Sequence, residues 1–197
     1  MAGKTISVGI SGRARTGKNT LAQMIVDNLD THPKNYKIVA VADPIKNMIL
    51  HMVPNADAEC LWGQSELRAT PLPGNLVDID GKSLTYRRAL MDIGSLGRQY
   101  NPDIWLNALV QDAKKNDNLE AYIVADLRFP NEINYLKDHN FFMVRIKRAD
   151  IPDINDVSET AQLEIPDDFF HHTIENNGSL SDLNREAKLI VNKIALL

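Results

Sequence analysis

The sequence contains a single cysteine, Cys60, so no disulfide can form within the chain. This is typical of proteins of a reducing cytoplasm, and we expect Cys60 to be a small buried residue.

Basic residues do not dominate: 22 lysines and arginines stand against 26 aspartates and glutamates, a net charge of −4. That balance argues against a protein that coats nucleic acid or an anionic membrane. No apolar run approaches the roughly 20 residues that cross a bilayer, so we expect neither a membrane span nor a signal peptide.

Aromatic residues are also scarce, at 6%, but apolar residues reach 44% of the 197 positions. A chain of this length and composition can form a core of its own within one domain. Short β-type runs alternate with helical patterns, which indicates a parallel sheet covered by helices on both faces. The predicted strands occupy residues 5–10, 37–42, 121–125, 141–146 and 172–175. The predicted helices occupy residues 18–29, 44–52, 86–96, 101–115, 130–139 and 180–194.

Two of these helices have recognisable starts. Asp43 is predicted to cap the second helix, with Pro44 at its first position. Ser179 and Asp182 are predicted to form a capping box at the last one. Residues 54–84 interrupt the alternation with prolines and glycines, and we predict an irregular insertion with a short hairpin near Asp80 and Gly81.

The strongest motif follows the first predicted strand and opens the first predicted helix, which is the context of a phosphate-binding P-loop. Its two glycines, Gly12 and Gly17, permit backbone conformations closed to other residues, so that loop N–H groups can converge on phosphate oxygens. The helix N-terminus adds about half a positive charge, and Lys18 adds a full one near the β- and γ-phosphates. The alternative is a glycine-rich turn that binds no nucleotide. The predicted ATP-binding residues of the loop are Gly12, Arg13, Ala14, Arg15, Thr16, Gly17, Lys18, Asn19 and Thr20.

One position departs from the common P-loop pattern, because Asn19 stands where serine or threonine usually follows the lysine. Asn19 can offer a carbonyl oxygen to Mg²⁺, directly or through water, and Thr20 is the other candidate. A GTPase would also need an Asn-Lys-x-Asp motif, but the Asn-Lys pair at Asn192 and Lys193 lacks the aspartate. The pattern therefore predicts a three-layer α/β P-loop NTPase fold, with about five parallel strands, and favours a kinase over a GTPase.

Asp126 directly follows the third predicted strand, so it should lie at the sheet edge that also carries the P-loop. A Walker-B-like aspartate organises magnesium at that edge, and we predict this role for Asp126; the alternative is a cap for Arg128 or for the following turn. Glu132 is placed to hold Arg128. Phosphoryl transfer depends on positioning and on neutralising charge, so several arginines converging on one cleft would fit, although any single arginine can be a solvated surface residue. Such arginines occur at Arg13, Arg15, Arg87, Arg88, Arg98 and Arg128.

Five stretches taken together resemble the phage-type deoxynucleoside monophosphate kinases, a branch of the P-loop nucleoside monophosphate kinases. The P-loop alone is common to many families, and the joint occurrence of the other four narrows the choice. The chain departs from that family at Asp156, where members often carry a histidine in an H-x-[ST]-E pattern. The stretches are residues 12–20; 42–46; 87–94 continuing to 97–98 and 103–105; 126–132; and 174–180.

The resemblance implies transfer of the γ-phosphate of ATP, with Mg²⁺, to a deoxynucleoside 5′-monophosphate. It implies catalytic roles for Lys18, Arg88, Asp126 and Arg128, and a magnesium site at Asn19, Thr20 and Asp126. It places Asn177 and Gly178 beside the adenine. The implied residues on the monophosphate side are Asp43, Lys46, Arg68, Arg87, Arg88 and Arg98.

The expected organisation is a single P-loop kinase domain over residues 1–197. It has a substrate-binding insertion at about 54–100 and a lid at about 150–168 that excludes water. We expect a small-molecule substrate, no nucleic-acid polymer or membrane partner, a homodimer as relatives suggest, and a cytoplasmic location, in the host if a phage encodes the chain. The alternatives are another small-molecule P-loop kinase, such as one resembling dephospho-coenzyme A kinase, and a non-catalytic ATP-binding regulator.

Overall fold

A computed structural model describes residues 7–29, 36–114, 121–151, 162 and 165–197. The chain divides into two compact units. The first contains residues 1–40 and 112–197, and the second is Val41–Gln111. Most of the predicted lid, and the stretch around Asp156, fall on residues 152–161 and 163–164, which lie outside the described residues.

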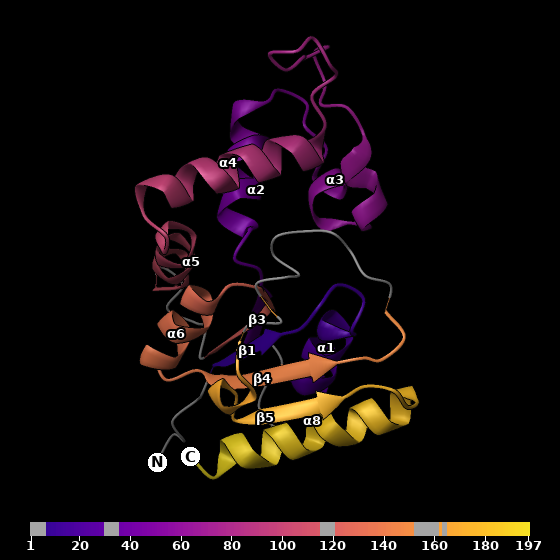
Figure 1. Ribbon diagram of the computed structural model, residues 1–197, viewed down its shortest axis with the longest axis vertical. Helices are drawn as coiled ribbons and strands as arrows, with labels where there is room; N and C mark the ends of the chain where they lie inside the picture. The colour runs from indigo at the N-terminus through magenta and orange to yellow at the C-terminus, as the bar shows by residue number, and fades with distance from the viewer. Residues whose placement is uncertain (1–6, 30–35, 115–120, 152–161, 163–164) are drawn as a thin grey trace. The chain divides into compact units, whose positions relative to one another are not determined.

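The first unit is built on a five-stranded, all-parallel sheet in the order β2-β3-β1-β4-β5 (Figure 1). The central strand β1 pairs with β3 on one side and β4 on the other, so the chain leaves β1 where the strand order reverses. In open α/β sheets this is where ligands bind. The predicted three-layer α/β P-loop fold class is confirmed. The strands are β1 (Val8–Ser11), β2 (Tyr36–Val39), β3 (Ala121–Leu127), β4 (Phe142–Lys147) and β5 (His172–Glu175).

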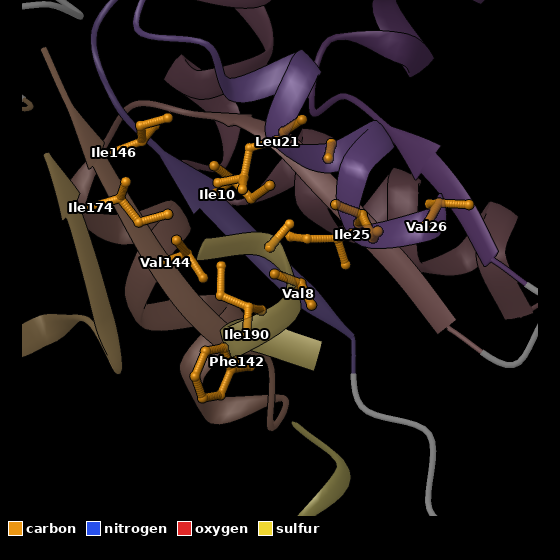
Figure 2. Packing of buried hydrophobic residues seen from close by; sticks show 14 of the residues in the cluster. Val8, Ile10, Leu21, Ile25, Val26, Phe142, Val144, Ile146, Ile174 and Ile190 are labelled. Atoms are coloured by element: carbon orange, nitrogen blue, oxygen red, sulfur yellow. The ribbon is translucent and has the colours of Figure 1, made fainter. Parts of the chain in front are cut away.

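The core of this unit lies between the sheet and two helices on one face, α1 (Lys18–Asn28) and α8 (Leu180–Ala195). Figure 2 shows side chains of β1, β4 and β5 pointing toward those of α1 and α8. Alternate residues of β1 face opposite sides: Val8 and Ile10 belong to this core, whereas Gly9 faces Met143 and Leu127. On that second side α6 (Pro130–Asp138) packs against β4 and buries Ile133 and Leu136.

The start of α8 is capped as predicted. The Ser179 hydroxyl accepts from the Asp182 N–H, and the Asp182 carboxylate accepts from the Ser179 N–H at 2.9 Å. The cap on α2 (Asp43–Met52) was predicted one residue too late, because Ala42 occupies the N-cap and Asp43 is already helical. Pro44 nevertheless lies in the first turn, where its missing N–H costs no hydrogen bond. Cys60 is buried, as predicted.

The second unit is largely helical. The region predicted as irregular contains α3 (Ala58–Trp62) and the 3₁₀ helix η2 (Ser65–Ala69), and its predicted hairpin is present as a Val77–Ser83 bridge with Gly81 at a φ of +76°. The helix predicted to end at residue 96 continues as α4 (Tyr86–Tyr100). Its Gly97 lets the buried Trp105 of α5 (Ile104–Lys114) pack against the helix backbone, so tertiary packing overrides the low helix propensity of glycine.

No helix within the described ranges is both long enough and apolar enough to cross a membrane.

His171 gives the first unit a dependence on pH. Its ring stacks on Phe142 with centroids 5.0 Å apart, and its Nδ1 accepts a hydrogen bond from the Met143 N–H at 2.9 Å. Burial lowers the pKa of His171 below its ordinary 6.5, and the positive charge of Lys137 lowers it further. The unfolded chain therefore takes up this proton at a higher pH than the folded chain, so stability should fall as the pH drops below about 6.5.

The expected effect is modest, because water screens a ring that is partly exposed. Thermal melts from pH 7.5 to 5.5 should show a steeper loss of Tm in the wild type than in His171→Gln, whose amide oxygen can still accept from Met143. Parallel melting curves for the two proteins would contradict this prediction.

Candidate phosphate-binding site

The loop after β1 has a backbone path that glycine makes possible. A Cβ on Gly12 would clash with the main-chain oxygen of Ile146 in β4, so no side chain fits there. Gly17, the N-cap of α1, has a φ of +101°, and the exposed Arg15 has a φ of +65°. Left-handed residues inside such a loop turn successive N–H groups toward one side, where they form a concave anion-binding surface. The first-turn N–H groups of α1 add to it, because they have no carbonyl partner within the helix.

Lys18 is held close to this loop. The residue is 9% exposed, and Nζ donates to the main-chain oxygens of Gly12 at 2.6 Å and Arg13 at 2.7 Å. The Thr16 hydroxyl donates to the same Arg13 oxygen at 2.8 Å. The ammonium group is therefore already positioned at the loop that would receive a phosphate, and the loop is braced by its own side chains.

Asn176 contributes to the loop although the sequence argument did not single it out. Its Nδ2 donates to the main-chain oxygen of Thr16 at 2.8 Å and would lie 2.8 Å from a Cβ on Gly17, which is too close for any side chain there. Asn177 instead accepts from the Ala149 N–H at 2.8 Å, which ties the β5–α8 loop to the residues that follow β4. Gly178 lies against Asp182 in the cap of α8. The adenine contacts of Asn177 and Gly178 stay predictions.

Asp126 lies within β3 and not after it, because the strand continues to Leu127. The pairing of β1 with β3 changes register here: Gly9 is opposite Val124, but Ser11 is opposite Leu127. The extra residue in β3 is a bulge next to Asp126, and bulges often redirect a side chain near a functional site. Ser11 directly precedes the P-loop, so Asp126 is close in register to the start of that loop.

Glu132 holds Arg128 through the main chain. Its buried carboxylate accepts from the N–H groups of Arg128, at 2.7 Å, and Phe129, at 3.1 Å. This fixes the turn from β3 into α6, directly after Asp126.

The oxygen donors predicted for magnesium are chemically suited to it. Asn19 and Thr20 are exposed on the first turn of α1, and Asp126 is half-buried in β3. Amide, hydroxyl and carboxylate oxygens are hard ligands, and Mg²⁺ commonly binds one or two carboxylates together with water and substrate phosphates. Across the described part of the chain, no cluster of three or more His, Cys, Asp or Glu residues could hold a metal by itself.

The predicted monophosphate-side residues all lie in the second unit, and three side chains there form one cluster. The Asp43 carboxylate accepts from Lys46 Nζ at 2.8 Å and from Trp62 Nε1 at 2.9 Å. Lys46 is buried, and its Nζ lies 5.3 Å from the centroid of the Trp62 ring. Trp62 is a member that the sequence argument missed, since no spacing links it to Asp43.

The predicted arginines of this unit contact different groups. Arg68 donates to the Leu61 oxygen at 3.3 Å, and Arg87 donates to the Ser65 oxygen at 2.8 Å. Arg88, predicted to be catalytic, pairs with Asp92 at 2.7 Å on the exposed surface of α4, and this pairing raises its pKa. Arg98 lies one turn from Gly94 on the same helix.

A named relative resembles this chain. A protein of Acanthamoeba polyphaga mimivirus named "Putative deoxynucleotide monophosphate kinase" is 25% identical over 158 residues, which cover 74% of this chain and 76% of the relative. No family model matches the chain. The similarity extends over most of both proteins, a length far greater than that of a P-loop.

Proposed function

We propose that this protein is a kinase that transfers the γ-phosphate of ATP to a deoxynucleoside 5′-monophosphate and yields the diphosphate for DNA precursor synthesis. The observation that carries the proposal is the structure of the loop after β1. Lys18 donates to the main-chain oxygens of Gly12 and Arg13 in this loop, and Asn176 donates to the main-chain oxygen of Thr16. The name of the mimivirus relative supports the same reaction class.

In this mechanism the loop amides and the N-terminus of α1 bind the triphosphate, and Lys18 neutralises charge on its β- and γ-phosphates. Bound Mg²⁺ would offset further charge on the triphosphate, and Asn19, Thr20 and Asp126 are the residues that would hold it. Arg128, fixed through Glu132, stabilises the transferring group. Asn177 and Gly178 border the adenine.

The acceptor phosphate is bound by cationic side chains of the second unit. Among them, Lys46 is buried and is oriented by Asp43 and Trp62. To bind the acceptor phosphate, Arg88 must first leave Asp92. Because both side chains are exposed to water, breaking this ion pair requires little free energy. Arg68, Arg87 and Arg98 supply the remaining charge.

The test is a coupled assay of ADP release with Mg²⁺ and ATP, across all deoxynucleoside monophosphates, their ribose counterparts and dephospho-coenzyme A. ADP release that depends on a deoxynucleoside monophosphate is the expected result. Release with dephospho-coenzyme A alone would reassign the acceptor. ATP binding with no acceptor-dependent release would point to a regulator, and no ATP binding at all would refute the proposal.

A further inference from the structure

Gln162 lies at the meeting point of the P-loop and β3. Its side-chain amide nitrogen donates to the main-chain oxygens of Gly12 at 2.8 Å and Leu127 at 2.9 Å, and the residue is 3% exposed. An amide NH₂ has two hydrogens, so both are used. Gln162 thus links the first residue of the phosphate loop to the residue that follows Asp126.

The main chain of Gln162 is itself anchored to the sheet. Its carbonyl oxygen accepts from Arg145 Nη2 at 2.7 Å, and Arg145 is a buried residue of β4. The same guanidinium donates to the Ile165 oxygen and to the Asp167 carboxylate, and it lies 5.1 Å from the Phe170 ring. Because Arg145 fixes the main chain of Gln162, the side-chain amide loses little additional conformational entropy when it binds the Gly12 and Leu127 oxygens.

The Gly12 oxygen receives two donors, Gln162 Nε2 and Lys18 Nζ, the latter at 2.6 Å. The Lys18 ammonium has three hydrogens and places two of them on the Gly12 and Arg13 oxygens, so it must release one of these carbonyls to donate more than one hydrogen bond to phosphate oxygens. A buried carbonyl left without a donor is costly, so the carbonyl would otherwise retain the lysine.

We propose that Gln162 is a positioning residue for ATP binding, which holds the Gly12 carbonyl so that Lys18 can move to the phosphates. This inference rests on the proposed function, since it assumes that the loop binds ATP. Gln162 would act through the loop backbone and Lys18, without any contact between its own side chain and the nucleotide.

The experiment compares Gln162→Met, which keeps the length of the side chain but removes both donors, with the matched control Gln23→Met on the exposed surface of α1. Calorimetry should give an ATP Kd about tenfold weaker for Gln162→Met, the equivalent of one unsatisfied buried group. Steady-state assays should give a raised KM for ATP and an unchanged KM for the acceptor. Gln23→Met should match the wild type in each measurement.

Gln162→Glu supplies a second readout and guards against a Met variant that fails to fold. An ionised carboxylate repels the Gly12 and Leu127 oxygens, whereas a protonated one can donate to one of them. The ATP Kd of this variant should approach that of the wild type as the pH falls from 8 to 6. A role confined to the stability of the fold would change the Tm of the variant with pH but leave the ATP Kd of the folded variant equal to that of the wild type.

The inference is overturned if both variants bind ATP within twofold of the wild type, or if the KM values for ATP and acceptor rise together. Wild-type protein that binds no ATP would instead overturn the proposed function, so the two failures are distinguishable.

Discussion

Lys18→Ala is expected to lower kcat/KM for ATP by about a thousandfold or more, because it removes the full positive charge of a buried lysine from the proposed phosphate site. The fold should survive the substitution. Each carbonyl that Lys18 contacts has another donor: Gln162 for the Gly12 oxygen, at 2.8 Å, and the Thr16 hydroxyl for the Arg13 oxygen, at 2.8 Å. Acceptor-dependent ADP release measures the loss, and a thermal melt measures the fold.

Lys188→Ala, on the exposed surface of α8, is the matched control and should retain full activity. If Lys18→Ala kept more than a tenth of the wild-type rate, Lys18 would have no role in transfer. A large drop in Tm for Lys18→Ala alone would mean that the lysine mainly supports the loop.

Asp126→Asn is expected to lower kcat by about a hundredfold and to raise the Mg²⁺ concentration needed for half-maximal rate. The substitution keeps the size of the side chain and removes its charge. A bulge in β3 places Asp126 beside the start of the P-loop, where a negative charge can help to hold a cation on the triphosphate. Titration of the rate with Mg²⁺ at fixed ATP measures both effects.

Asp27→Asn, exposed on α1, serves as the control for this substitution. If Asp126 only caps the turn into α6, the variant will lose thermal stability with an unchanged Mg²⁺ dependence. That outcome would remove Asp126 from the metal site.

The strands and the phosphate loop were predictable because their signals are local. Strands β1, β3 and β4 are short, largely apolar runs, and both glycines of the loop occupy positions that other residues cannot adopt without strain or a clash. The last residues of β1, β2, β3 and β4 differ from their predicted positions by one to three residues, whereas β5 has its predicted bounds. Pairing with a neighbour, and not propensity, decides where a strand stops. Asp126, for example, was predicted after β3 and lies within it.

The second unit was less predictable. Prolines and glycines in residues 54–84 indicated irregular chain, yet α3, which buries Cys60 and Leu61, and η2 form there. The cluster of Asp43, Lys46 and Trp62 joins residues up to 19 positions apart, and no periodicity predicts it. Arg88, singled out for its place in a motif, is paired with Asp92 one helical turn away.

The sequence alone determined the fold class, the alternation of strands and helices in the first unit, and the loop that ends at Lys18, since each follows from interactions between near neighbours. Only the tertiary structure decided which groups support that loop. Asn176 and Gln162 lie 160 and 150 residues from the carbonyls of Thr16 and Gly12 that they bind. A buried carbonyl needs a donor, but local sequence does not specify which distant side chain provides it; the packing of β4, β5 and their loops does.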